Sequence, residues 1–132
     1  MDAEMYQQLE KAKSDKNPAL AAKLAVYLMA AGTDARYHLS VVLIYAWALE
    51  AQGQLEDALK YYQLLERLYK SNGKLTPPAA HMVVRQARVL KGLRKYAAAD
   101  TLLRELRRRV DAELPSVFAK GVHSLITRAA SS

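Results

Sequence analysis

Apolar residues recur every three to four positions along most of this chain, with charged and polar residues between them. This spacing places apolar side chains on one face of an α-helix, and no segment shows the clean period of two that marks a half-buried strand. Glycine and proline are sparse and divide the chain into helix-length pieces. We therefore predict seven helices, at residues 2–14, 18–31, 34–52, 54–71, 77–91, 93–111 and 114–129.

The ends of these segments carry helix start and stop signals. Pro18, Pro77 and Pro115 stand near predicted starts, where the missing N–H would have no partner in any case. Asp34 and Thr76 are the expected N-caps. Three glycines are expected to take the left-handed backbone of a C-terminal cap, namely Gly32, Gly53 and Gly73.

Residues 39–49 are rich in β-branched and aromatic side chains, so a buried strand is the alternative interpretation of this stretch. The length of the stretch and its continuation into the polar residues 50–52 favour a helix. A helix that is apolar nearly all round packs on several sides. We therefore expect the helix at 34–52 to lie in the middle of the fold.

The chain also contains an internal repeat. An offset of 41 residues matches small or apolar positions: Val42 with Val83, Ala46 with Ala87, Leu49 with Leu90, Ala58 with Ala99, Tyr62 with Leu103 and Leu65 with Leu106. An offset of 36 residues predicts a weaker first copy, in which Ala22, Val26 and Met29 match the residues 58, 62 and 65. Small residues let antiparallel helices approach closely, and each helix pair leaves an apolar face that the next pair must cover.

The second copy, Ala46…Leu49…Gly53…Leu55…Ala58…Tyr62…Leu65, resembles the longer variant of the tetratricopeptide repeat (TPR), as does the third, Ala87…Leu90…Tyr96…Ala99…Leu103…Leu106. The resemblance covers residues 18–110 and implies an all-α, right-handed α-solenoid of antiparallel helix pairs. Its single domain, 1–132, would hold a degenerate repeat at 2–32, repeats at 34–71 and 77–111, and a capping helix at 114–129. The capping helix is expected to cover the last repeat with Val117, Phe118, Val122, Leu125 and Ile126, and to expose Lys120, Ser124 and Arg128.

TPR domains bind peptide segments in a groove lined by the first helix of each pair. The resemblance therefore implies a partner-binding groove lined by Ser40, Leu43, Trp47, Glu50, His81, Val84, Arg85, Arg88, Lys91 and Lys95. An apolar patch around Trp47 beside a basic stripe suits a partner segment with an apolar anchor and acidic neighbours. Core packing of Trp47 and a solvated basic face are the alternative interpretations. The carboxylate clamp of some TPR domains is incomplete, because Ile44 stands where asparagine is needed.

Charge is unevenly distributed along the chain, whose net charge is +7. Residues 1–66 carry 6 basic and 9 acidic side chains, whereas residues 67–132 carry 14 basic and 4 acidic side chains. This asymmetry favours an acidic partner for the C-terminal half. Non-specific binding of nucleic acid is the alternative function, although the helices show no pattern for reading bases.

The residues needed for other functions do not form a recognisable pattern. There is no cysteine, the three histidines are far apart in sequence, and no glycine-rich phosphate loop occurs. We therefore expect neither enzymatic activity nor a metal or cofactor. The longest apolar run, 39–49, is too short to span a membrane and the N-terminus does not read as a signal peptide, so a cytoplasmic location is expected.

The expected function is protein–protein interaction, as an adaptor, a scaffold or a chaperone. The polar first helix predicts incomplete coverage of Ala22, Leu24 and Leu28. Self-association through this N-terminal end is therefore a further expectation.

Overall fold

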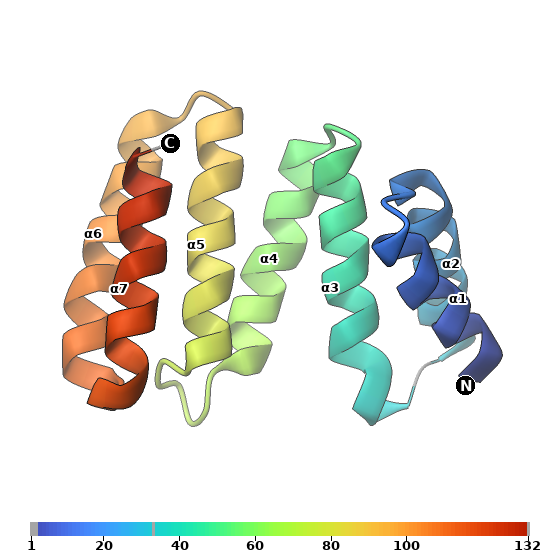
Figure 1. Cartoon of the computed structure of the whole chain (residues 1–132), viewed down its shortest axis with the longest axis horizontal. Coiled ribbons are helices and arrows are strands. Elements are labelled where there is room, and N and C mark those ends of the chain that lie inside the picture. Colours follow the sequence, from blue (N-terminus) through green and yellow to red (C-terminus); the bar gives the residue numbers. More distant parts are fainter. Residues whose placement is uncertain (1–2, 33, 132) are drawn as a thin grey trace. The chain divides into compact units, whose positions relative to one another are not determined.

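The computed structural model describes residues 3–32 and 34–131, and it is all-helical over these residues (Figure 1). The helices are α1 (Ala3–Ser14), α2 (Pro18–Ala31), α3 (Ala35–Ala51), α4 (Leu55–Tyr69), α5 (Pro77–Gly92), α6 (Tyr96–Glu113) and α7 (Ser116–Ser131). Each predicted helix is confirmed, and residue 2 of the first lies outside the described residues. The stretch 39–49 lies within α3, so the strand interpretation is wrong.

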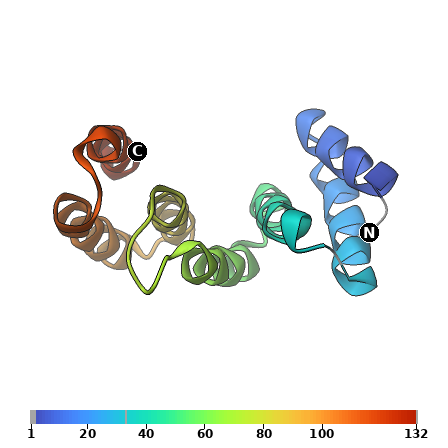
Figure 2. The ribbon, with the colours of Figure 1, turned by 90° about the horizontal axis from the view of Figure 1, so that it is seen from below.

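Two compact units make up the chain, Met1–Tyr61 and Tyr62–Ser132, with the boundary inside α4. In the first unit, α3 packs against both members of the antiparallel hairpin formed by α1 and α2. In the second unit, α7 packs in the same way against the hairpin formed by α5 and α6. Seen nearly end on, α5, α6 and α7 form a triangle (Figure 2).

Each unit has a core made of alanines and branched apolar residues. The first core contains Leu9, Ala12, Ala21, Ala25, Leu28, Val41, Ile44 and Ala48. The second contains Leu75, Ala79, Ala80, Val83, Ala87, Ala99, Leu103, Leu106, Val110, Leu114, Val122 and Ile126. Both cores thus combine small alanines with larger branched side chains, the two kinds of residue that the repeat contains.

The turns inside the three hairpins have the same hydrogen bonds. In the second hairpin, the N–H of Gln54 donates to the carbonyl of Leu49 (2.9 Å) and that of Gly53 donates to Glu50 (3.0 Å). The equivalent bonds join residues 17 to 12 and 16 to 13 in the first hairpin, and 95 to 90 and 94 to 91 in the third. This pair of bonds is the Schellman motif, in which the residue after the helix takes a positive φ.

Positive φ angles mark the three turns, at Lys16 (54°), Gly53 (79°) and Arg94 (63°). Only one of the three turns has glycine, the residue that takes this conformation without steric cost. Gly32 has a positive φ at the C-cap of α2, as predicted. Gly73 also has a positive φ, but it lies in the turn between Ser71 and Lys74, beyond the end of α4, and is not a helix cap. The predicted N-cap Thr76 is confirmed, because its Oγ1 accepts a hydrogen bond from the N–H of Ala79 at 3.2 Å. Asp34 stands at the N-cap position of α3.

The turns also fix the register of the repeat. Ala58 and Ala99 donate their N–H to the carbonyls of Gln54 and Lys95, and the residue with the same bond in the first hairpin is Ala21. The repeat offset is therefore 41 residues between the second and third copies and 37 between the first and second. The equivalents of Ala58, Tyr62 and Leu65 are thus Ala21, Ala25 and Leu28, each at most 1% exposed.

The predicted offset of 36 for the first copy is therefore wrong by one residue. Val26, which this offset assigned to the core, is 47% exposed, and Ala22 and Met29 are only partly buried. The helix α2 is apolar nearly all round, so two neighbouring stripes of its surface fit the repeat equally well. Of the three residues predicted to be incompletely covered, Leu28 is buried, whereas Ala22 and Leu24 are only partly buried. The large apolar side chains exposed on α2 are Leu20, Val26 and Tyr27.

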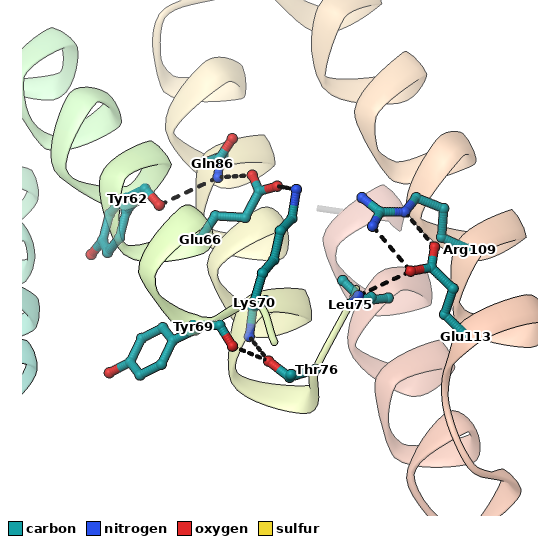
Figure 3. A network of polar contacts seen from close by, with 10 residues as sticks. Tyr62, Glu66, Tyr69, Lys70, Leu75, Thr76, Gln86, Arg109 and Glu113 are labelled. Carbon is teal, nitrogen blue, oxygen red and sulfur yellow. Dashed lines mark hydrogen bonds and ion pairs between the residues drawn. The ribbon is translucent and has the colours of Figure 1, made fainter. Parts of the chain in front are cut away.

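Polar side chains tie the helices of the second unit together (Figure 3). Gln86 is buried on α5, and its Nε2 donates to the carbonyl of Tyr62 (3.4 Å) and to Oε1 of Glu66 (2.8 Å) on α4. The other carboxylate oxygen of Glu66 pairs with Lys70 at 3.1 Å. In the loop between α4 and α5, the Thr76 hydroxyl donates to the carbonyl of Tyr69 at 2.7 Å.

The same loop is anchored to the end of α6 by Glu113 (Figure 3). Oε1 of Glu113 accepts from the N–H of Leu75 at 2.9 Å, and Oε2 accepts from Nε of Arg109 at 2.7 Å. These two bonds, that from Arg109 first, lower the pKa of Glu113 to about 2. Arg109 and Glu113, four residues apart on α6, thus form an ion pair at the end of the helix.

The helix α7 covers the second core with fewer residues than predicted. Val122 and Ile126 are buried and Leu125 is partly buried, but Val117 and Phe118 are 77% and 48% exposed. The prediction for these two is wrong because α7 begins at Ser116, and its first turn extends beyond the apolar face that reaches the core. Three side chains are exposed as expected: Lys120, Ser124 and Arg128.

Candidate functional site

A cleft of about 370 Å³ lies between α1 and α3, which are the first helix of the first hairpin and the first helix of the second. It is lined by Tyr6, Glu10, Lys13, Ser14, Ser40, Leu43 and Ile44. Two of the predicted groove residues, Ser40 and Leu43, therefore line this cleft.

The helical period positions each wall of the cleft. On α1, the lining residues Tyr6, Glu10 and Lys13 follow the spacing i, i+4, i+7 and so form one stripe. Leu9 and Ala12 lie on a different stripe of α1 and are buried in the core, which fixes the rotation of the helix. The Tyr6 ring is held by the ring of Tyr37 on α3, at a centroid separation of 4.6 Å.

The cleft combines an apolar floor with a charged rim. Leu43 is partly buried and Ile44 is 6% exposed, so they offer apolar surface at the bottom. Glu10 and Lys13 are exposed on the rim and present one charge of each sign. Such a surface suits a protein segment that inserts an apolar side chain and makes polar contacts on both sides.

The other two predicted groove residues of the first unit, Trp47 and Glu50, do not line the cleft. Trp47 is partly buried and packs against the first core, which agrees with the alternative interpretation of Trp47 as a packing residue. Its neighbour Tyr45 contacts Tyr61 of α4 edge to face, with centroids 5.0 Å apart. Burial first, and then the charges of Tyr61 and Asp57, raise the pKa of Tyr45. Glu50 is partly buried at the end of α3.

Five of the six predicted residues of the second unit lie on α5, and contacts with the core or with neighbouring helices are made by Val84, Arg85 and Lys91. The guanidinium of Arg85 lies over the ring of Tyr62, 5.8 Å from the centroid, where a cation interacts favourably with an aromatic face. Burial and the neighbouring charge of Arg85 lower the pKa of His81. Val84 packs against the second core, and Arg88 is exposed.

Lys91 has a structural role that the sequence did not reveal. Its Nζ donates to the carbonyls of Ala129 (2.5 Å) and Ala130 (3.2 Å) at the end of α7. A cation at this position interacts favourably with the partial negative charge of the helix C-terminus. Lys95 is exposed and stands at the N-cap position of α6.

The structure thus brings Ser40 and Leu43 together with residues of α1 that sequence reasoning missed. Tyr6, Glu10, Lys13 and Ser14 were not among the predicted groove residues, because the first copy of the repeat was aligned only through its second helix. The turns at Lys16 and Gly53 have the same backbone conformation, and this similarity identifies α1 as the first helix of a hairpin. The amino-acid types at the two positions differ, so the sequence does not show the similarity.

Among the described residues, there is no group of three or more His, Asp or Glu side chains placed to bind a metal ion. No described helix is both long and apolar enough to cross a membrane. In comparisons with known proteins, no protein family, no curated protein and no solved structure matches this chain.

Proposed function

We propose that this chain is a protein-interaction module of the TPR type, which holds a segment of another protein against the first helices α1 and α3. The observation that carries the proposal is the cleft between α1 and α3, with its apolar floor and its charged rim. The three hairpins with identical turns support the repeat character of the module. Its cellular role would be that of an adaptor, a scaffold or a chaperone.

The partner segment is expected to be a peptide with an apolar anchor. The floor of Leu43 and Ile44 would take this anchor, and the rim of Glu10 and Lys13 would set its orientation through charge. Exposed charge pairs contribute little affinity individually, so the anchor would supply most of it.

The test is an affinity capture from the native host, followed by mass spectrometry, with wild type and two variants of equal net charge. The cleft variant reverses the rim by Glu10→Lys and Lys13→Glu. The control variant reverses two exposed charges on α4 by Glu56→Lys and Lys60→Glu. A true partner should be recovered with wild type and the control, and strongly depleted with the cleft variant.

Each partner recovered in this way is then reduced to a peptide and titrated into the purified protein. Trp47 is the single tryptophan of the chain and packs against the core of the first unit, so its fluorescence reports on this region. Saturable 1:1 binding that Ser40→Arg abolishes supports the proposal. Equal recovery of every protein by the cleft variant and wild type would refute it.

A further inference from the structure

The helices α3, α5 and α7 present matching positions to their neighbours, so α7 can be compared with the first helices of the two preceding hairpins. Each has a rear stripe, which faces the helices that precede it. These stripes are Val41–Tyr45–Ala48 in α3, Met82–Gln86–Val89 in α5 and Val122–Ile126–Ala129 in α7. The stripe of α3 packs with α1 and α2, Gln86 bonds to α4, and the stripe of α7 packs with α5 and α6.

Each of these helices also has a front stripe, one residue further along. The front stripes are Val42–Ala46–Leu49 in α3, Val83–Ala87–Leu90 in α5 and His123–Thr127–Ala130 in α7. In α5, this stripe receives the second helix of its own hairpin, because Val83 and Ala87 share a core with α6. The helix α7 therefore matches the first helix of a repeat in position, and His123 of its front stripe contacts α6 through a 2.8 Å bond to Asp111.

The front stripe of α7 differs in chemistry from the two before it. Val42, Ala46, Val83 and Ala87 are at most 4% exposed. In α7, the equivalent residues are the partly buried His123 and the exposed Thr127. The stripe borders a hollow of about 660 Å³ lined by Lys120, His123, Ser124, Thr127 and Arg128. Small side chains still allow close approach, but polar and cationic groups replace the apolar ones.

The helix α6 adds two further cations beside this stripe. A hollow of about 200 Å³ is lined by Asp100, Leu103, Arg104 and Arg107 of α6 together with Ala130 of α7, so its lining holds two cations and one carboxylate. A similar hollow of about 540 Å³ lies one repeat earlier. There, Gln63 corresponds to Arg104 and Leu90 corresponds to Ala130, and residues of α6 form the opposite wall. Arg104 and Arg107 thus flank the place that a second helix would take next to α7.

The second unit has a large excess of basic over acidic side chains. Residues 62–132 hold 14 basic and 5 acidic side chains. Four of the five acidic side chains are already paired in the second unit: Glu66 with Lys70, Glu105 with Arg108, Glu113 with Arg109 and Asp111 with His123. Among the described residues, no ion pair involves Arg104, Arg107, Lys120 or Arg128.

We infer that this surface binds an acidic helical segment of a partner protein, laid against α7 where the second helix of a further repeat would lie. We call it the terminal face and define it by Arg104, Arg107, Lys120, His123, Thr127 and Arg128. The register supplies a helix-shaped site with small side chains at its centre, and the cations supply the complementary charge. Nucleic acid is the competing class, but a site shaped for one helix beside α7 favours a protein segment.

The test uses a synthetic peptide of 16 residues, the length of α7, with glutamates along one helical face and blocked ends. A second peptide carries glutamine in place of every glutamate, which keeps the helix propensity similar. Each is titrated into the isotope-labelled chain and followed by the backbone amide signals. The acidic peptide should shift the amides of the C-terminal part of α6 and of α7, and the glutamine peptide should not.

Two charge-matched variants then localise the binding. Arg104→Glu with Arg128→Glu should weaken the acidic peptide by about tenfold or more, because two attractions become repulsions. Arg67→Glu with Lys74→Glu changes the net charge equally at exposed positions away from the terminal face and should have a much smaller effect. The cleft variant Glu10→Lys/Lys13→Glu should bind the peptide normally, so failure here is distinguishable from failure of the proposed function.

Three results would overturn the inference. An equal loss of affinity in both charge-matched variants would mean unspecific attraction to a basic protein. The absence of amide shifts at millimolar peptide would mean that α7 is a solvated polar cap. Tighter binding of a short DNA duplex to the same amides, with a steep salt dependence, would identify the surface as a nucleic-acid site.

Discussion

In the first unit, α3 rests against the hairpin of α1 and α2, and in the second, α7 rests against the hairpin of α5 and α6. The backbone plan is the same, but the side chains that hold it differ. The first unit relies on alanine-mediated approach and on aromatic contacts such as Tyr6 with Tyr37. The second unit adds buried and partly buried polar bonds from Gln86, Lys91 and Glu113.

This difference explains why the two units offer different surfaces. In the second unit, most acidic side chains form ion pairs with side chains of the same unit, and basic side chains remain in excess. In the first unit, residues 1–61 carry 6 basic and 8 acidic side chains, and both signs remain available on the rim of the cleft. One repeat geometry thus supports two surfaces of distinct charge, because the geometry itself depends only on small and apolar positions.

The largest expected effect tests the register that makes the units comparable. Leu28 and Leu106 occupy equivalent positions and are 1% and 2% exposed. Leu28→Ala and Leu106→Ala should each reduce the free energy of unfolding by about 2–5 kcal/mol, because each leaves a cavity in a core. Urea denaturation followed by circular dichroism measures this change.

The control for this prediction is Val26→Ala, since Val26 is the residue that the offset of 36 places in the core. At 47% exposure, its truncation should change the free energy of unfolding by no more than about 0.5 kcal/mol. A loss at Val26 as large as that at Leu28 would contradict the offset of 37 between the first and second copies.

A smaller effect is expected at the buried polar contact that distinguishes the second unit. Gln86→Ala leaves the Tyr62 carbonyl and a carboxylate oxygen of Glu66 without this donor, which should cost about 1–3 kcal/mol of stability. Gln63→Ala is the control, because Gln63 is an exposed glutamine of the neighbouring helix α4. Equal denaturation midpoints for the two variants would show that the contact is unimportant.

The contribution of Glu113 to the free energy of unfolding should depend on pH. Its folded-state pKa of about 2 lies below the ordinary value of 4.5, so the unfolded state takes up this proton first as the pH falls. The stabilisation is therefore complete above pH 4.5 and is lost as the pH approaches 2. Glu113→Gln should lower the urea midpoint at pH 7, by less than Gln86→Ala because Glu113 is partly exposed.

The decisive comparison for Glu113 is the difference between wild type and Glu113→Gln at a series of pH values. This difference should shrink steadily between pH 4.5 and pH 2. A difference that stays constant over this range would mean that the carboxylate charge does not stabilise the loop.

The smallest effect concerns the turns. Lys16→Gly and Arg94→Gly should each stabilise the protein by about 0.5–1 kcal/mol, because glycine takes a positive φ without a Cβ clash. Gly53→Ala should destabilise it by about 1 kcal/mol for the same reason, since a Cβ at Gly53 meets no atom within 4 Å and only the backbone angle matters. Thermal unfolding resolves these shifts, and a stabilising Gly53→Ala would contradict the shared turn geometry.

The amino-acid sequence alone specifies the helices, their main start and stop signals, and the offset of 41 residues between the second and third copies. The helix signals depend on neighbouring residues in the chain. The offset of 41 residues depends on apolar positions that polar residues flank on both sides of the helix, so that only one alignment fits. Proline and threonine at the start of α5 and the glycine after α3 carry their signal in the chain itself. The helical period then places Ala58 and Ala99 in the cores without further information.

The packing of the helices was needed to establish the register of α2, the partners of Lys91 and Gln86, and the repeat position of α7. An alanine-rich helix that is apolar on all sides fits the repeat in two registers, and only its neighbours select Ala21 over Ala22. A long polar side chain reaches several partners, and the sequence does not say which helix end lies within its reach. For both reasons, the cleft between α1 and α3 and the terminal face exist only as products of the packed helices.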